Sequence, residues 1–289
     1  MTVSPENQKL RPEMETDTEG AREEALRRAI SGGARPAKPN GIATSFTFGW
    51  RALLKIKYIP EQLIDATIFP IMFLLMFTYL FGGALAGSTG DYLQFLLPGI
   101  LVQTIVTLTM YTGVELNNDI TKGIFDRFRS LPIWHPSVLV GALMVDGVRY
   151  TMASAIMIIL GLILGFRPEG GILGMVAAVL LLQVFAFSLS WIWTTLGMIM
   201  RSEKSLMGVS MMVMFPLTFI SNVFVDPETM PSWLQGFVEI NPISLVVTAV
   251  RGLMHGTVTF AEISWVLVAA VILTAVFAPL TMYLYRNKN

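Results

Sequence analysis

The sequence predicts an all-α integral membrane protein with six transmembrane helices, and three observations support this prediction. Hydrophobic residues make up 54% of the 289 residues and charged residues only 14%, and the mean hydropathy is +0.63. A soluble domain carries about a quarter charged residues. The apolar residues fall in blocks long enough for a helix to cross a hydrocarbon core of about 30 Å, which takes about 20 residues. The blocks lack the alternation of polar and apolar positions that barrel strands require.

Six segments meet this length, and each is expected to form one transmembrane helix. They are Leu63–Gly82, Leu93–Tyr111, Val148–Phe166, Gly174–Met200, Met207–Val225 and Trp265–Tyr285. Three of them contain an internal proline, at Pro70, Pro216 and Pro279. In a membrane bundle, neighbouring helices and hydroxyl side chains compensate for the backbone bond that a proline removes. The three prolines are therefore predicted to kink these helices without ending them.

The basic residues predict the orientation of the chain in the membrane. Of the 20 Lys and Arg residues, only Arg167 and Arg251 fall on the side opposite the termini. Because short cytoplasmic flanks carry the excess of Lys and Arg, both termini are expected on the cytoplasmic side of the membrane. The first apolar segment follows a charged stretch and is followed by no small-residue cleavage site, so we expect no signal peptide.

Two segments precede the first predicted span. Residues 1–44 mix charges with Gly and Pro and are expected to form a mobile cytoplasmic tail, ahead of a six-helix transmembrane domain over residues 45–289. Within that domain, the stretch 46–58 combines aromatic residues and leucines with Arg51, Lys55 and Lys57. This composition is typical of an amphipathic helix on the inner leaflet, with its cations toward anionic headgroups.

The connection between the second and third predicted spans carries a short amphipathic helix that Pro132 ends. Apolar residues at i, i+1, i+4 and i+7 form one face: Ile124, Phe125, Phe128 and Leu131. The opposite face is charged: Asp126, Arg127 and Arg129. Such a stripe suits a groove in a partner protein. Packing on the lipid surface or on its own bundle explains it equally well.

The segment after the fifth predicted span, on the outer side, is expected to form two short re-entrant or interfacial helices. One apolar face combines four residues: Trp233, Leu234, Phe237 and Val238. Pro242 suits a first helical turn, and Asn241 is a favourable N-cap. The run 243–250 is too short to cross the bilayer but apolar enough to enter the outer leaflet. The alternative is a plain folded external loop.

Charged side chains within reach of the membrane are few, and an ionised group at mid-bilayer costs about 3 kcal/mol. Asp146 and Arg149 open the third span at i,i+3 and can pair on one helix face. Glu115 and Asp119 follow the predicted second span. All four are expected near the cytoplasmic boundary, where they anchor and pair at the inner rim of the bundle.

The polar residues deeper in the predicted spans are uncharged, which bears on whether the chain could be an ion-coupled pump. They are Gln103, Thr104, Thr107 and Thr109 in the second span and Gln183, Ser188, Ser190, Thr194 and Thr195 in the fourth. An ion-coupled pump needs carboxylates or histidines at that depth. The fifth span is rich in Met and Phe, including Met211, Phe215 and Phe219. This soft surface suits a permissive path for hydrophobic molecules, although ordinary helix packing is the simpler interpretation of any single residue.

Several classes of function are disfavoured by what the sequence lacks. Without cysteine, disulfides, thiolate catalysis and cysteine metal sites are excluded. His135 and His255 lie far apart in sequence, so no metal site is expected. Zero net charge gives no basic footprint for nucleic acid. No Gly-x-x-x-x-Gly-Lys-Ser/Thr motif occurs, so ATP and Mg²⁺ are not expected to bind this chain, and no hydrolase motif suggests an enzyme.

Three segments together resemble the ABC exporter permeases of the daunorubicin-resistance type, a branch of the second class of ABC export permeases. These are the loop from Lys122 to Ile133, the residues Gly141, Asp146 and Arg149, and the segment from Phe219 to Leu253, with Met-Pro-Ser-Trp-Leu-Gln, Asn-Pro-Ile-Ser and Arg-Gly-Leu in it. The resemblance covers roughly Phe46 to Tyr285. It implies a six-helix permease that dimerises to twelve helices and recruits two copies of a separate ATPase subunit.

The resemblance also implies roles for particular residues. The loop after the second span would carry the coupling helix that docks on the ATPase, through Lys122, Gly123, Phe125, Asp126, Arg127, Phe128 and Arg129. Trp50–Tyr58 would be the connecting helix. The extracellular re-entrant element would include Trp233, Phe237, Asn241, Pro242 and Arg251. The substrate path would run between the second and fifth helices of the two protomers, near Gln103, Thr107, Met211, Phe215 and Phe219.

The expected function is therefore the transmembrane subunit of an ATP-driven exporter of hydrophobic drugs, antibiotics or lipid-like compounds. The expected partners are two ABC ATPase subunits, a second permease copy in a homodimer, membrane lipid and a hydrophobic substrate. The alternative is a secondary multidrug transporter driven by an ion gradient. A membrane-embedded enzyme acting on lipids would need a polar catalytic cluster, which the sequence does not suggest.

Overall fold

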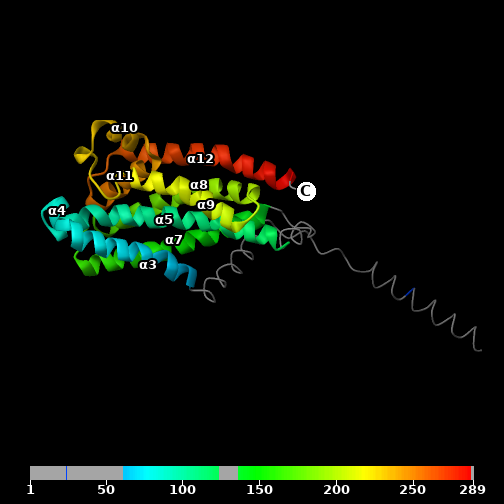
Figure 1. Cartoon of the computed structure of the whole chain (residues 1–289), viewed down its shortest axis with the longest axis horizontal. Helices are drawn as coiled ribbons and strands as arrows, with labels where there is room; N and C mark the ends of the chain where they lie inside the picture. The colour runs from blue at the N-terminus through cyan, green and yellow to red at the C-terminus, as the bar shows by residue number, and fades with distance from the viewer. Residues whose placement is uncertain (1–23, 25–60, 124–135, 288–289) are drawn as a thin grey trace, which may run out of the picture. The chain divides into compact units, whose positions relative to one another are not determined.

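The computed structural model describes Glu24 and residues 61–123 and 136–287 of the chain. The described helices run side by side along one bundle, with α10 and α11 at one end of it (Figure 1). In order they are α3 (Glu61–Met76), the π-helix η1 (Phe77–Phe81), α4 (Gly82–Ala86), α5 (Thr89–Thr121), α7 (Pro136–Leu164), α8 (Gly171–Ile199), α9 (Glu203–Phe219), the 3-10 helix η2 (Pro227–Thr229), α10 (Ser232–Ile240), α11 (Pro242–His255) and α12 (Phe260–Asn287).

Five helical segments are long and apolar enough to cross a membrane. They are Thr67–Ala86, Thr89–Thr121, Val145–Leu164, Gly171–Ile199 and Phe260–Tyr285. They coincide with five of the six runs predicted from the sequence. Pro70 and Pro279 lie inside α3 and α12, which continue through them as expected.

The predicted span Met207–Val225 is wrong at both ends. Helix α9 begins at Glu203, where the Ser202 side chain caps it by accepting from the Ser205 N–H at 3.3 Å. It continues through Pro216 and ends at Phe219, after 17 residues. Residues 220–225 then leave the helix. Their carbonyl groups are bonded by side chains from elsewhere in the fold, which hydropathy alone cannot reveal.

The second span is also longer than predicted. Helix α5 begins at Thr89, where Ser88 accepts from the Asp91 N–H at 3.0 Å, and it continues ten residues beyond Tyr111 to Thr121. Glu115 and Asp119, which were expected to follow the span, are therefore part of the helix. The extension is stabilised by tertiary contacts of its polar residues, described below.

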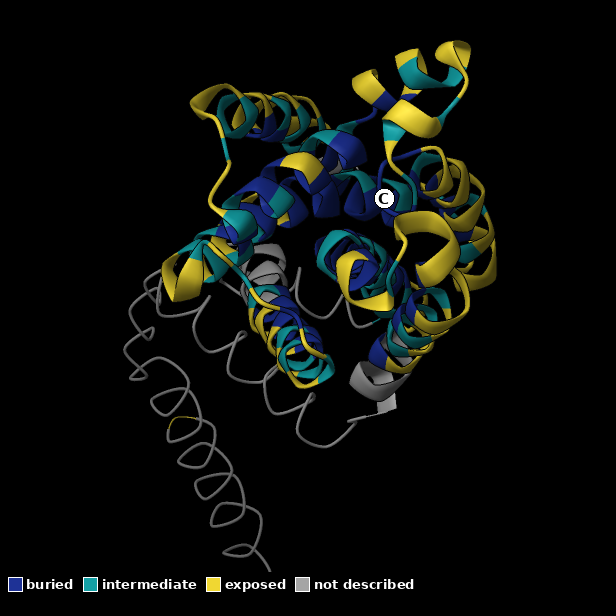
Figure 2. Ribbon diagram, turned by 90° about the vertical axis from the view of Figure 1, so that its left-hand side faces the viewer, coloured by how far each residue is buried: buried dark blue, intermediate teal, exposed yellow. Residues whose placement is uncertain are grey.

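Helix α5 is the centre of the bundle. It packs against α3, α7, α8, α9 and α11, and most of its membrane-spanning stretch is buried, whereas α12 is largely exposed. Figure 2 shows the buried residues gathered inside the bundle and the exposed residues on its periphery. A spanning bundle is expected to expose apolar side chains in this way, because the surrounding lipid is itself apolar.

Two glycines bring α5 and α8 into close contact. A Cβ atom on Gly113 would lie 2.3 Å from the Trp193 carbonyl oxygen, and one on Gly197 would lie 2.5 Å from the Gly113 carbonyl oxygen. Small residues allow backbones to approach in this way where membrane helices cross. Neither position can accept a larger side chain unless the helices separate.

We therefore expect Gly113→Ala to destabilise the folded bundle by about 1–3 kcal/mol, the usual cost of overpacking. The measurement is the apparent melting temperature of the purified protein in detergent. Gly208→Ala in α9 is the control, because its added Cβ would meet no atom within 4 Å. Equal melting temperatures for the two variants would contradict the close crossing.

The segment after α9 forms the two short helices that the sequence predicted. Helices α10 and α11 meet at a bend of 80°. Asn241 caps α11 as expected, because its side-chain oxygen accepts from the Ile243 N–H at 2.9 Å, and Pro242 occupies the first helical turn. Helix α11 packs on α8, α5 and α12, so it belongs to the core of the bundle.

Candidate functional site

Three charged side chains meet between α5 and α7. Arg149 Nη1 lies 3.3 Å from Asp146 Oδ1, and Arg149 Nη2 lies 2.9 Å from Glu115 Oε1. Asp146 and Arg149 are buried, whereas the Glu115 side chain is 27% exposed. The ion pair at i,i+3 has the spacing that the sequence suggested. The contact from α7 to Glu115 on α5 was not expected, and it gives the arginine two acidic partners.

Hydrogen bonds continue this charged cluster across the bundle to α8. Thr112 Oγ1 donates to Asp146 Oδ2 at 2.5 Å and lies 3.5 Å from the Tyr150 hydroxyl. The Tyr150 hydroxyl is 3.0 Å from Ser190 Oγ. We call these six residues the charge network: Thr112, Glu115, Asp146, Arg149, Tyr150 and Ser190. It connects α5, α7 and α8 through side chains whose polar groups are paired, as burial requires.

The charge network lies close to the predicted docking loop. Glu115 is six residues before the end of α5, or about 9 Å along the helix axis. The loop between α5 and α7 follows, so the network joins the two helices that flank this loop. At its start, Lys122 is the C-cap and donates its N–H to Asn118 O, and Gly123 has a φ of 68°. A left-handed glycine commonly ends a helix in this way.

The remaining predicted docking residues lie outside the described residues. These are Phe125, Asp126, Arg127, Phe128 and Arg129, and the predicted connecting helix Trp50–Tyr58 lies outside them as well. Their proposed contacts therefore remain predictions from the sequence.

A second polar contact fastens the same end of α5 to α8. Asn117 is buried, and its Nδ2 donates to the carbonyl oxygens of Gly197 at 2.9 Å and Met200 at 2.8 Å. This caps the end of α8 from a neighbouring helix. The sequence analysis missed Asn117. The residue could have been noticed only as an amide side chain six residues beyond the predicted end of the span at Tyr111, in a stretch that proves to be helical.

The predicted substrate-path residues are placed on two neighbouring helices. Met211, Phe215 and Phe219 are exposed on α9, whereas Gln103 and Thr107 are half-buried on α5. Helices α5 and α9 pack against each other. Within one copy of the chain the two helices are therefore neighbours, and the three α9 residues remain open to the surroundings.

An aromatic row that the sequence analysis missed extends this surface to α3. The ring centroids of Phe215 and Phe219 are 4.3 Å apart, and Phe219 stacks on Phe224 at 5.3 Å. Phe224 in turn lies 5.0 Å from Phe77 and 6.3 Å from Phe73. Because Phe224 is in the segment that leaves α9, its position depends on how that segment is held.

Side chains from α5, from α11 and from Asn241 between α10 and α11 hold this segment in place. Asn241 Nδ2 donates to the Leu217 and Ile220 carbonyl oxygens, and the Tyr92 hydroxyl donates to the Phe224 carbonyl at 2.9 Å. Arg251 Nη2 donates to the Asn222 carbonyl at 2.9 Å. These bonds satisfy backbone groups that a helix would otherwise pair, a requirement at membrane depth.

Arg251 and its neighbours in the predicted re-entrant element have distinct environments. The Arg251 guanidinium carbon lies 3.8 Å from the ring centroid of Phe95, and its Nε donates to the Phe95 carbonyl at 3.1 Å. Trp233 and Phe237 are instead 68% and 64% exposed on α10. Arg251 and Asn241 thus donate hydrogen bonds to backbone carbonyl groups, whereas the Trp233 and Phe237 side chains are exposed. Within the described ranges, no group of three acidic, histidine or cysteine side chains is placed to hold a metal ion.

Comparison with known proteins places the chain in a family. Residues 45–255 match the family described as ABC-2 type transporter. The chain is 54% identical to the daunorubicin resistance ABC transporter permease protein DrrB1 of Streptomyces coeruleorubidus, over 91% of this chain and 93% of that protein.

More distant relatives share the same description as permeases. The chain is 23% identical to the probable doxorubicin resistance ABC transporter permease protein DrrC of Mycobacterium tuberculosis, over 67% of this chain and 70% of that protein. It is also 23% identical to the O-antigen export system permease protein RfbA of Klebsiella pneumoniae, over 77% and 85%. The described apolar helices agree with a multi-pass membrane protein, and an ABC permease implies an ABC ATPase partner. The chain therefore belongs to the ABC-2 type transporter family.

Proposed function

We propose that this chain is the transmembrane subunit of an exporter that moves hydrophobic drugs, antibiotics or lipid-like compounds out across the bacterial cell membrane. ATP and Mg²⁺ bind to a separate ATPase subunit. The observation that carries this proposal is the 54% identity to a daunorubicin resistance permease along nearly the whole chain. An ion-gradient transporter is the competing hypothesis.

The proposed coupling element is the loop from Lys122 to Arg129, which docks on the ATPase. Movement of the docked loop reaches the bundle through both flanking helices, α5 and α7. The contacts from Arg149 to Glu115 and Asp146 support this proposal, because they connect those two helices close to the loop. Because the two helices are connected, a movement of the docked loop would displace α5 and α7 together.

The proposed assembly contains two copies of this chain and two ATPase subunits. The substrate path lies beside α5 and α9, near Gln103, Thr107 and the exposed residues Met211, Phe215 and Phe219. In this proposal α9 is the fifth of six transmembrane helices in each protomer, spanning about 26 Å with its 17 residues. An exposed face of Met and Phe side chains supports the assignment, because it adapts to varied apolar molecules.

The proposed orientation places both termini in the cytoplasm. It predicts which introduced cysteines a membrane-impermeant reagent can label in intact cells. Because the chain has no cysteine, a single introduced thiol is the only target. In intact cells a membrane-impermeant maleimide is expected to label Glu169→Cys, between α7 and α8. Lys204→Cys, at the start of α9, should react only after permeabilisation. The reverse pattern would contradict the orientation.

Transport in reconstituted vesicles tests the proposed function. Vesicles containing this chain and its ATPase should accumulate daunorubicin when ATP is supplied on the ATPase side, and vanadate should stop the uptake. Vesicles with the permease alone form the control, and they are also tested with an imposed proton or sodium gradient. Uptake by the permease alone under such a gradient would favour the secondary transporter.

A further inference from the structure

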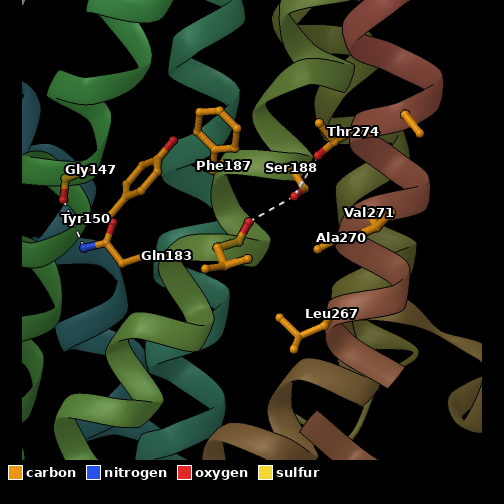
Figure 3. Close-up of a pocket in the computed structure, with 11 residues that line it drawn as sticks. Gly147, Tyr150, Gln183, Phe187, Ser188, Leu267, Ala270, Val271 and Thr274 are labelled. Carbon is orange, nitrogen blue, oxygen red and sulfur yellow. Dashed lines mark hydrogen bonds between the residues drawn. The ribbon is translucent and has the colours of Figure 1, made fainter. Parts of the chain in front are cut away.

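A groove of about 630 Å³ lies on the periphery of the bundle, away from the α5–α9 path. Helix α8 contributes Phe187 and Ser188 between two walls, with Tyr150 and its neighbours from α7 on one side and Val271 and its neighbours from α12 on the other (Figure 3). Val271 is 66% exposed and Phe187 is 42% exposed. The groove is therefore accessible to molecules dissolved in the surrounding lipid.

The groove lies near the middle of the membrane. Thr274 stands 14 residues after Phe260 and 13 before Asn287, so it is about 20 Å from either end of α12. Gln183 is 12 residues from the start of α8 and 16 from its end. Polar side chains at this depth are costly unless they find partners, so their hydrogen bonds indicate what the groove can bind.

The polar groups of the groove offer acceptors. Gln183 Nε2 donates to the Gly147 carbonyl at 3.1 Å and to Thr151 Oγ1, which orients the amide. Its Oε1 accepts no hydrogen bond from the described residues. Thr274 Oγ1 donates to Ser188 Oγ at 3.0 Å, and Ser188 donates to the Val184 carbonyl. These three donor groups, the Gln183 amide and the Thr274 and Ser188 hydroxyls, thus donate within the protein, while Gln183 Oε1 and the Thr274 oxygen keep lone pairs available.

We propose that this groove binds an uncharged, lipid-soluble small molecule that carries a hydroxyl donor. Its donor bonds to Gln183 Oε1 or to the Thr274 oxygen, and its apolar body packs against Phe187, Leu267 and Val271. The groove volume is in the range for drug-sized ligands, about 300–1,000 Å³.

A phospholipid does not satisfy the same groups. Its headgroup lies about 15 Å from the midplane of a 30 Å hydrocarbon core, and its acyl chains carry no hydrogen-bond donor. The donor requirement therefore separates the proposed ligand from bulk lipid. Tyr150 lines the groove and also belongs to the charge network, so a bound molecule contacts the cluster that joins α5 to α7. The proposal concerns binding and does not depend on ATP-driven transport.

Photolabelling of the full-length protein in lipid vesicles tests this inference. Three diazirine probes are compared: a lipid-soluble aromatic alcohol, the same compound with its hydroxyl replaced by hydrogen, and a phosphatidylcholine carrying the diazirine in an acyl chain. Labelled residues are identified by mass spectrometry. The alcohol should label the groove-lining segments of α8 and α12 about three- to tenfold more than its hydrocarbon analogue, the ratio expected from one hydrogen bond.

Two variants locate the binding to the groove. Gln183→Leu combined with Thr274→Val removes both acceptors and should abolish the preference for the alcohol, and Ala275→Phe should block the groove and lower its labelling to a similar extent. Val276→Phe is the matched control, because Val276 is exposed on α12 but does not line the groove. Melting temperatures identify any variant that fails to fold. If the variant that lacks the acceptors does not fold, the labelling of Ala275→Phe decides the result. Equal labelling by alcohol and hydrocarbon, stronger labelling by the phospholipid, or unchanged labelling in Ala275→Phe would overturn the proposal.

Discussion

Replacing Arg149 by methionine is expected to yield a protein that reaches the membrane but is strongly destabilised there. The change removes the partner of Asp146 and of Glu115, and it leaves the buried Asp146 carboxylate with only the Thr112 hydroxyl. Removing one member of a buried ion pair costs about 3–5 kcal/mol. The measurement is the apparent melting temperature in detergent, together with the amount of folded protein recovered.

The control is Arg167→Met. Arg167 Nη1 donates to the carbonyl oxygens of Leu162 and Phe166, and no acidic side chain within the described segments forms an ion pair with it. This variant should melt close to the unchanged protein. If Arg149→Met and Arg167→Met melt alike, the charge network does not stabilise the bundle.

A neutral version of the charge network separates stability from coupling. The triple variant Glu115→Gln, Asp146→Asn and Arg149→Met removes every charge, so no buried ion is left unpaired and much of the lost stability should return. It also removes the ionic link between α5 and α7. We therefore expect a folded variant that binds its ATPase but transports less substrate for each ATP hydrolysed. Full transport in this variant would show that the ion pairs serve stability alone.

The sequence predicted the features that depend on neighbouring residues in the chain. The apolar runs, the i,i+3 spacing of Asp146 and Arg149 and the cap of α11 by Asn241 are all local patterns. Each follows from helix geometry or from the length of a hydrocarbon core, so no knowledge of the packing is needed.

Features that depend on distant residues were missed. The end of α9 is set by Asn241, which lies 24 residues after Leu217 and bonds its carbonyl oxygen. The extension of α5 accompanies contacts of Glu115 with Arg149 and of Asn117 with Gly197, and the partners are 34 and 80 residues away. Hydropathy assigns polar residues to the ends of spans. The fold instead places Glu115 and Asn117 inside α5 and Asn241 between two helices, because hydrogen-bond or ion-pair partners are available there.

The second large effect is expected from Phe125→Ala combined with Phe128→Ala in the predicted coupling helix. If these aromatic side chains fill a groove of the ATPase, their removal takes away the apolar centre of the contact. Interface residues of this kind each contribute about 2 kcal/mol or more, and a loss of 2 kcal/mol is about thirtyfold in affinity. ATP-driven transport should fall to near background, while membrane insertion and the melting temperature stay unchanged.

Copurification with the ATPase is the direct measurement, since it separates docking from transport. Trp233→Ala combined with Phe237→Ala provides a matched aromatic pair, because both side chains are exposed on α10, at the opposite end of the bundle from the C-terminal end of α5 (Figure 1). This control should retain the ATPase. Retention of the ATPase by the Phe125 and Phe128 double variant would instead favour the other interpretation of its apolar stripe, in which the short helix packs on lipid or on its own bundle. Docking would then have to rest on the charged face of the loop, and Arg127→Ala with Arg129→Ala would become the variant that releases the ATPase.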